Sequence, residues 1–102
     1  ERLNPNTIEV EISIPTRFSL NQNFPNHFNP VTSIQYAIAN KQFVTLKVYD
    51  ILGKEITTLI NENKEAGNYS VDFNAVELPS GVYIYQLSTA DFTQIKKMIL
   101  TK

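Results

Sequence analysis

Residues 43–50, FVTLKVYD, decide the fold class of this chain. Val44, Leu46 and Val48 alternate with more polar residues, and a period of two is the pattern of a strand with one buried face. The nearest approach to a helical pattern is KEITTLINENKE at residues 54–65. Its threonines and asparagines disfavour so short a helix, so a strand is the better interpretation there too.

Further short segments with strand character lie on both sides of this one. We expect about seven strands, at residues 17–22, 33–39, 43–50, 54–60, 69–73, 82–89 and 92–101. Asparagine, proline and glycine mark the breaks between them, as in NFPNHFNPVTS (23–33), DILG (50–53), the polar NENKEAGN (61–68) and LPSG (78–81). Short strands with frequent turn signals predict an all-β, antiparallel β-sandwich.

Residues 1–16, ERLNPNTIEVEISIPT, differ from the rest of the chain. Pro5 and Pro15 interrupt the segment, so we expect a linker or N-terminal edge segment, followed by one sandwich domain at residues 17–102. Within it, apolar residues alternate with polar ones at Ile8, Val10, Ile12 and Ile14. The same pattern suits a strand that adds to the sheet edge of a partner, which leaves self-association through edge strands open.

The composition excludes several classes of function. Nine basic and ten acidic side chains give a net charge of −1, whereas binding to nucleic acid needs a basic surplus. No apolar run reaches about 18 residues, so no transmembrane segment is expected. Cysteine is absent, which excludes disulfides and thiolate sites. The charge is uneven, because residues 92–102 carry +3 and the other 91 residues carry −4.

Residues that could perform catalysis are few and scattered. His27 is the only histidine, and we interpret it as a loop residue that is solvated or hydrogen-bonded. Ser80 precedes Gly81, but LPSGV lacks the pattern of a nucleophile elbow. The three glycines of the chain form no phosphate-binding loop. We therefore expect no enzymatic activity, no metal and no cofactor.

Tyrosines are candidates for sugar binding, because their flat rings stack on sugar faces. The chain has five, at Tyr36, Tyr49, Tyr69, Tyr83 and Tyr85. All lie in alternating segments, where packing in the core or across strands is the commoner role. Tyr49 is the one expected to be exposed, because it faces away from Val48.

The segment Gly81-Val82-Tyr83-Ile84-Tyr85 has the pattern of a tyrosine corner. In such a corner the ring packs inward and the hydroxyl reaches a backbone group upstream. Tyr83 is expected to make that contact, and Tyr85 is expected to lie in the core. This interpretation explains the motif without a ligand.

Three long segments together resemble a known family. They are FSLNQNFPNHFNPVTSIQYAI (18–38), VTLKVYDILGKEITTLINE (44–62) and AGNYSVDFNAVELPSGVYIYQLSTADFTQIKKMILTK (66–102). They contain, in order, a Q-N-aromatic-P-N loop, an F-N-P turn, a V-Y-D-x-x-G hairpin, a P-x-G-x-Y motif and an apolar last strand with lysines. This order is similar to that of the C-terminal sorting domains of type IX (Por) secretion cargo. His27 departs from it, because the family usually has a second proline there.

The resemblance implies an immunoglobulin-like sandwich that directs an upstream cargo domain through the type IX translocon. The cargo would pass the periplasm of a Gram-negative bacterium and reach the cell surface or the medium. A sortase-like peptidase would be a second partner, removing the domain by a cut within residues 1–16. By position, the recognition motifs of the family correspond to Pro79, Gly81, Tyr83, Lys96, Lys97 and Lys102.

Two other functions stay open. The family is also similar to immunoglobulin-like modules of flagellar hook-cap type, which share the fold but not the sorting role. A domain of that kind would be an accessory carbohydrate-binding module or a structural module of a secreted enzyme.

Overall fold

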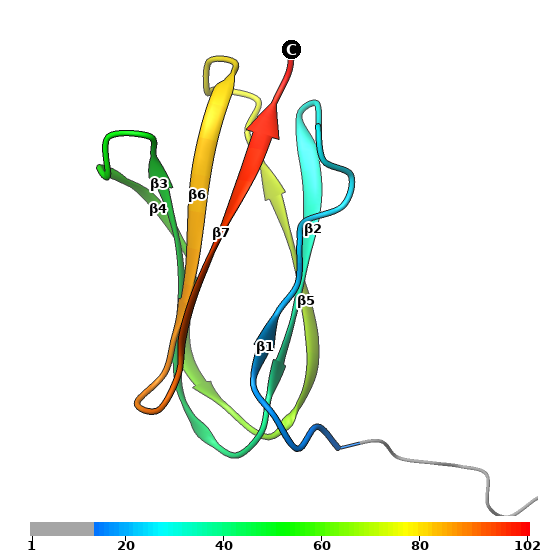
Figure 1. Cartoon of the computed structure of the whole chain (residues 1–102), viewed down its shortest axis with the longest axis vertical. Coiled ribbons are helices and arrows are strands. Elements are labelled where there is room, and N and C mark those ends of the chain that lie inside the picture. The colour runs from blue at the N-terminus through cyan, green and yellow to red at the C-terminus, as the bar shows by residue number, and fades with distance from the viewer. Residues whose placement is uncertain (1–13) are drawn as a thin grey trace, which may run out of the picture.

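The computed structural model describes residues 14–102. Most of the expected linker, including the alternating Ile8, Val10 and Ile12, therefore lies outside the described residues. All seven elements in the described range are strands (Figure 1), and no helix there could cross a membrane. They are β1 (Ser19–Leu20), β2 (Val31–Ile38), β3 (Gln42–Asp50), β4 (Glu55–Lys64), β5 (Gly67–Asn74), β6 (Gly81–Ser88) and β7 (Thr93–Leu100).

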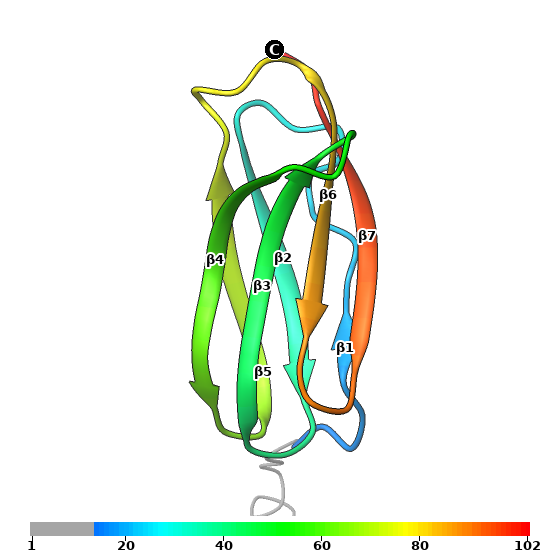
Figure 2. The same cartoon turned by 90° about the vertical axis from the view of Figure 1, so that its left-hand side faces the viewer.

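The strands form two antiparallel sheets that pack face to face. One sheet has the order β1-β2-β5 and the other the order β4-β3-β6-β7. Figure 2 shows the four-stranded sheet in front of the three-stranded one. Non-consecutive strands pair in both sheets, β2 with β5 and β3 with β6, as in the Greek-key sandwiches of the immunoglobulin class. The expected all-β, immunoglobulin-like sandwich of about seven strands is confirmed.

Alternate residues of the strands build the core between the sheets. Val44, Leu46 and Val48 of β3 are completely buried, as the pattern of residues 43–50 predicts. Full burial of one such side chain contributes about 1.5–3 kcal/mol. The other strands supply Leu20, Ile34, Tyr36, Ile38, Phe73, Tyr83, Tyr85, Leu87, Met98 and Leu100.

The turn between β3 and β4 forms where the DILG sequence predicts it. The carboxylate of Asp50 accepts hydrogen bonds from the N–H groups of Leu52 and Lys54, both at 2.9 Å. Gly53 has a φ of +90°, a conformation that glycine adopts without strain. Aspartate and glycine therefore direct the chain back on itself, and Leu52 is left exposed at the tip.

The first predicted strand is longer than the observed one. Residues 17–22 were expected to form it, but β1 contains only Ser19 and Leu20. The chain then continues as an irregular segment that forms two isolated bridges, one between Phe24 and Ser33 and one between Phe28 and Leu100. Asn21 and Phe24 still bond to Gln35 and Ser33 of β2, so the pairing is interrupted at residues 22–23, and Pro25, which lacks an N–H group, follows directly.

The predicted break at residues 61–68 is also wrong. β4 continues through Lys64, and β5 already begins at Gly67. Asn63 pairs with Phe43 of β3, and Lys64 pairs with Gln42. The segment is polar because it forms an edge of the sheet, where charged side chains face water, and not because it is a loop.

Candidate recognition surface

The start of β6 forms a tyrosine corner. Tyr83 is only 5% exposed, and its hydroxyl donates a hydrogen bond to the carbonyl oxygen of Pro79 at 2.7 Å, which confirms the predicted upstream contact. Burial, followed by the negative charge of Asp50, raises the pKa of Tyr83, so the hydroxyl stays protonated as a donor. Gly81 has a φ of +156°, which favours glycine. The loop before β6 is thus held in one conformation.

The last residue of the chain closes onto the same loop. The backbone N–H of Lys102 donates to Oγ of Ser80 at 2.9 Å, and its ammonium group donates to the carbonyl oxygen of Val76 at 2.7 Å. Pairing of Leu100 with Gly81 carries the chain end to this position. The structure therefore brings together four of the six expected recognition residues, Pro79, Gly81, Tyr83 and Lys102.

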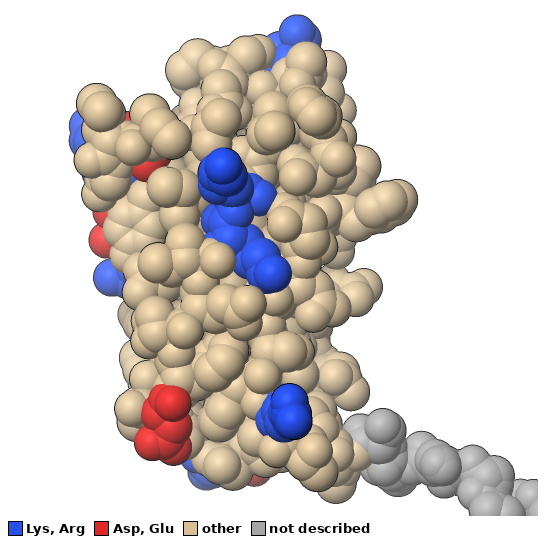
Figure 3. Space-filling view, in the orientation of Figure 1, with Lys and Arg blue, Asp and Glu red and all other residues tan. Residues whose placement is uncertain are grey.

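The two remaining residues, Lys96 and Lys97, lie in the middle of β7. Lys97 is exposed and pairs with Ile84 on the outer face of the four-stranded sheet, whereas Lys96 is half-buried and lies on the same side of β7 as Met98. About 17 Å of extended strand separates Lys97 from the terminal lysine, at about 3.4 Å per residue. Figure 3 shows Lys and Arg side chains gathered over β7, without acidic side chains beside them. These lysines form a second, basic patch.

The loop before β2 anchors the outer edge of β7, a role that sequence analysis did not predict. Phe28 is 2% exposed, and its N–H donates to the carbonyl oxygen of Ile99 at 3.0 Å. The N–H of Thr101 donates back to the carbonyl oxygen of Phe28, also at 3.0 Å. Oδ1 of Asn26 accepts a hydrogen bond from the N–H of Ile99 at 2.8 Å. The last part of β7 is therefore bonded on both sides.

A buried amide holds this loop in shape. Asn23 is 2% exposed, and its Nδ2 donates to the carbonyl oxygen of Pro25 at 3.0 Å and to Oγ1 of Thr32 at 2.9 Å. The neighbouring Gln22 donates from Nε2 to the carbonyl oxygen of Lys97 at 2.6 Å. The density of asparagine and proline at residues 23–33 was the only sequence signal for this arrangement.

Tyr85 connects β6 to the same segment from inside the core. It is completely buried, as predicted, and its hydroxyl donates to the carbonyl oxygen of Asn21 at 2.7 Å. Burial raises the pKa of Tyr85 to about 12, and a backbone hydrogen bond of Asn23 opposes the rise in part. The neutral hydroxyl therefore links the two sheets over the whole physiological pH range.

The tyrosines do not form a platform for sugar. Tyr36, Tyr83 and Tyr85 are buried, whereas Tyr49 and Tyr69 are half-buried. Tyr49 was expected to be exposed, but it is half-buried and pairs with Ile84 and Glu55 on the adjacent strands. In the described part of the chain, the exposed aromatic residues are two phenylalanines, Phe24 and Phe43.

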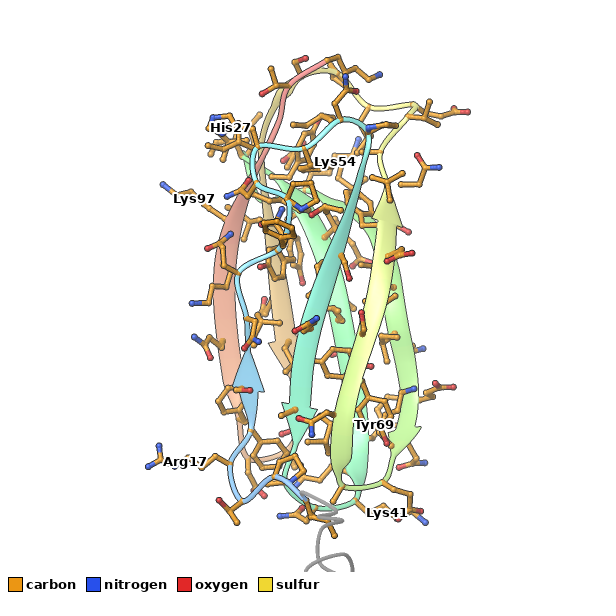
Figure 4. All side chains as sticks on the ribbon, turned by 90° about the vertical axis from the view of Figure 1, so that its right-hand side faces the viewer. Arg17, His27, Lys41, Lys54, Tyr69 and Lys97 are labelled. Carbon is orange, nitrogen blue, oxygen red and sulfur yellow. The ribbon has the colours of Figure 1, made fainter. Side chains whose placement is uncertain are left out.

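His27 is exposed in its loop, as predicted, and lies at the same edge of the sandwich as Lys97 (Figure 4). Residues 14–102 contain no group of three or more His, Cys, Asp or Glu side chains that could hold a metal ion. The candidate surface instead presents backbone, hydroxyl and ammonium groups. Such groups suit recognition by another macromolecule.

Comparison with known proteins gives one match. The model of a family described as the secretion system C-terminal sorting domain matches residues 22–101. Neither the curated proteins nor the solved structures compared with this chain give a significant match. The matched range begins at Gln22, in the segment that anchors β7, and includes every expected recognition residue except Lys102.

Proposed function

We propose that the chain, which belongs to the family of secretion system C-terminal sorting domains, directs an upstream cargo across the outer membrane through the type IX secretion system. It acts by being recognised as a folded module, without chemistry of its own. Its partner is the type IX translocon, and the cargo is delivered to the cell surface or the medium of a Gram-negative bacterium.

One observation supports a recognition site at the end of the sandwich where the chain terminates. The ammonium and N–H groups of Lys102 bond to the loop at Val76 and Ser80, next to the tyrosine corner. Two segments far apart in the sequence thus form one surface. We propose that the exposed Pro79, Gly81 and Lys102 contact the translocon there, and that the buried Tyr83 holds their loop in shape.

The basic patch is the second part of the proposed contact. Lys96 and Lys97 are absent from the three ion pairs found among residues 14–102, so their charges remain available to an acidic partner. Charges at the rim of an interface chiefly raise the rate of encounter. We therefore assign these lysines to steering, and the terminal surface to specific docking.

Removal of the domain by a sortase-like peptidase is part of the proposal. The cut would fall within residues 1–16, ahead of the first strand of the sandwich at Ser19–Leu20. The cargo would then be released, or attached to the cell surface.

The test uses residues 1–102 fused behind a signal peptide and a reporter, in strains with and without the translocon. We expect translocon-dependent appearance of the reporter outside the cell. Retention in the periplasm of both strains would contradict the sorting function and favour an accessory binding module.

Point variants locate the recognition surface. Deleting β7 would remove Met98 and Leu100 from the core, so loss of export after that deletion would not distinguish recognition from folding.

We expect the double variant Lys96→Gln and Lys97→Gln to slow export without loss of stability. The matched control is Lys41→Gln with Lys54→Gln, since both of these lysines are exposed elsewhere. Equal export by the two double variants would exclude the basic patch.

A further inference from the structure

The outer face of the three-stranded sheet has a shallow depression that the sorting function does not use. Its volume is about 340 Å³, at the lower end of the range for small-molecule sites. Figure 4 looks onto this face, with β1, β2 and β5 toward the viewer. The lining residues are Ser19, Asn21, Gln35, Tyr36, Ala37, Asn68, Tyr69 and Ser70.

The strand register shows which of these side chains face the solvent. Ala37 pairs with Ser19 on one side and with Asn68 on the other, and Gln35 pairs with Ser70. Directly opposed residues point to the same face of a sheet, here the face opposite the core. Tyr36 is buried in the core. It and its cross-strand partner Tyr69 therefore line the depression with main-chain atoms. The methyl group of Ala37 forms a small apolar floor between amides and hydroxyls.

The amides of this depression are free to bind a ligand. Among residues 14–102, no hydrogen bond is made by the side chains of Asn21, Gln35 or Asn68. Each amide offers both donors and acceptors, which matches the paired donor and acceptor character of sugar hydroxyls. A surface of this kind is suited to a polyhydroxylated ligand.

The charge of the face selects among such ligands. The outward positions of β2 and β5 are Val31, Ser33, Gln35, Ala37, Asn68, Ser70, Asp72 and Asn74, read from the register. Asp72 is the one charged residue among them, and it is negative. Arg17, just before β1, extends away from β2 and β5 at the edge of the sheet (Figure 4). No cation at the outward positions of β2 and β5 therefore balances Asp72, and a neutral ligand is favoured over an anionic one.

An exposed aromatic ring lies farther along the same face. Phe24 is 79% exposed and forms a bridge with Ser33, so its side chain points to the outer face as well. The hydroxyl of Ser33 in turn lies 3.0 Å from that of Ser70 at the rim of the depression. Along β2, the row of Ser33 is about 7 Å from the row of Gln35, at about 3.4 Å per residue. An elongated ligand lying along the strands would reach both the ring and the amides.

We propose that this face binds a neutral oligosaccharide. The amides of Asn21, Gln35 and Asn68 would bond the hydroxyl groups of one sugar unit above Ala37, and the ring of Phe24 would stack on the C–H face of another. This site differs from a tyrosine platform, and it is independent of the translocon contacts.

The test uses the purified 102-residue chain in native gels that contain one polysaccharide each. The neutral probes are laminarin, mannan, xylan and dextran, and the acidic probes are alginate and polygalacturonate. We expect at least one neutral probe to retard the protein and the acidic probes to retard it less. Failure of every neutral probe, or preference for the acidic ones, would overturn the proposal.

Variants then assign the site. We expect Gln35→Ala with Asn68→Ala to raise the dissociation constant about tenfold or more, as expected for the loss of one or two hydrogen bonds. Phe24→Ala is expected to weaken binding independently. The matched control, Asn61→Ala with Asn63→Ala, removes two exposed amides from β4 in the other sheet. Binding that is equally weakened in the control, or unchanged in all variants, would contradict the proposed site. The gel assay contains no translocon, so its result does not depend on whether the chain acts as a sorting signal.

Discussion

The two edge strands of the four-stranded sheet, β7 and β4, are treated differently by the rest of the molecule. The last part of β7 is bonded along its outer edge by the main chain of Phe28 and by the side chains of Gln22 and Asn26. Within residues 14–102, no backbone group of β4 receives such a bond from a loop. The outer edge of β4 is therefore open and relies on its charged side chains to discourage pairing with another chain.

The difference shows how the proposed recognition residues are held. An exposed edge strand is free to shift or fray, but β7 is fixed on both sides where it leads to Lys102. A docking surface formed by two chain segments needs this rigidity, because ordering a loose strand on binding costs free energy. β4, in contrast, leaves its outer edge without such bonds in the described part of the chain.

Phe28→Ala is expected to have the largest effect on this arrangement. The side chain is buried at 2% exposure, and truncating a buried phenylalanine costs about 3–5 kcal/mol. The free energy of unfolding from urea denaturation measures the loss. In the control Phe43→Ala, the ring is 51% exposed, and the loss should stay below about 1 kcal/mol. Similar losses in both variants would mean that the loop does not secure β7.

Alkaline pH is expected to weaken the link between Tyr85 and Asn21. The pKa of Tyr85 is raised to about 12 in the folded chain from its ordinary value of 10.0, so the unfolded state loses its proton first. The contribution of Tyr85 is complete below pH 10 and is lost as the pH rises toward 12. It amounts to roughly 3 kcal/mol at about 1.4 kcal/mol per unit.

Denaturation of the wild type and of Tyr85→Phe over this pH range measures the effect. The variant should lose less stability than the wild type between pH 10 and pH 12, because it has no hydroxyl to ionise at this position. Parallel pH profiles for the two proteins would argue against the raised pKa.

Asn26→Ala tests the capping of β7 by a side chain. It removes the acceptor of the Ile99 N–H in an exposed bond, and the expected cost is about 0.5–1.5 kcal/mol. Asn61→Ala on the open edge strand β4 is the control and should change stability by less than about 0.5 kcal/mol. Light scattering should also show more self-association for the Asn26 variant, since the N–H group of Ile99 at the edge of β7 becomes available. Equal behaviour of the two variants would remove the distinction between the edges.

Lys41→Ala is expected to have the smallest effect. Its ammonium group lies 3.6 Å from a carboxylate oxygen of Glu65, and the two side chains are 65% and 75% exposed. Exposed ion pairs contribute little, so thermal unfolding should show a change below about 0.5 kcal/mol. A larger loss would show that charges at the β4–β5 turn hold the open edge more firmly than the contacts suggest.

The core was predictable because local alternation and burial coincide. Val44, Leu46 and Val48 are buried as their spacing indicates, and the hydroxyl of Tyr83 bonds upstream as the motif predicts. The ends of strands were harder to predict. Residues 61–64 are polar, yet they continue β4, because an edge position tolerates polar residues that a turn also favours.

The candidate recognition surface was likewise predictable in part. The sequence placed Pro79, Gly81 and Tyr83 together because they are neighbours in the chain. It did not show that Lys97 and Lys102 lie in separate patches, or that Tyr49 is half-buried. Such relations depend on strand order.

Local sequence patterns are enough to predict an all-β sandwich with a tyrosine corner, since a period of two and a turn motif act over a few residues. The contacts of Asn26 with Ile99 and of Lys102 with Ser80 follow instead from how the strands are arranged in space. A side chain's type states what it can donate or accept. Its hydrogen-bond partner depends on which strands lie side by side. These two contacts join residues that are 73 and 22 positions apart in the sequence.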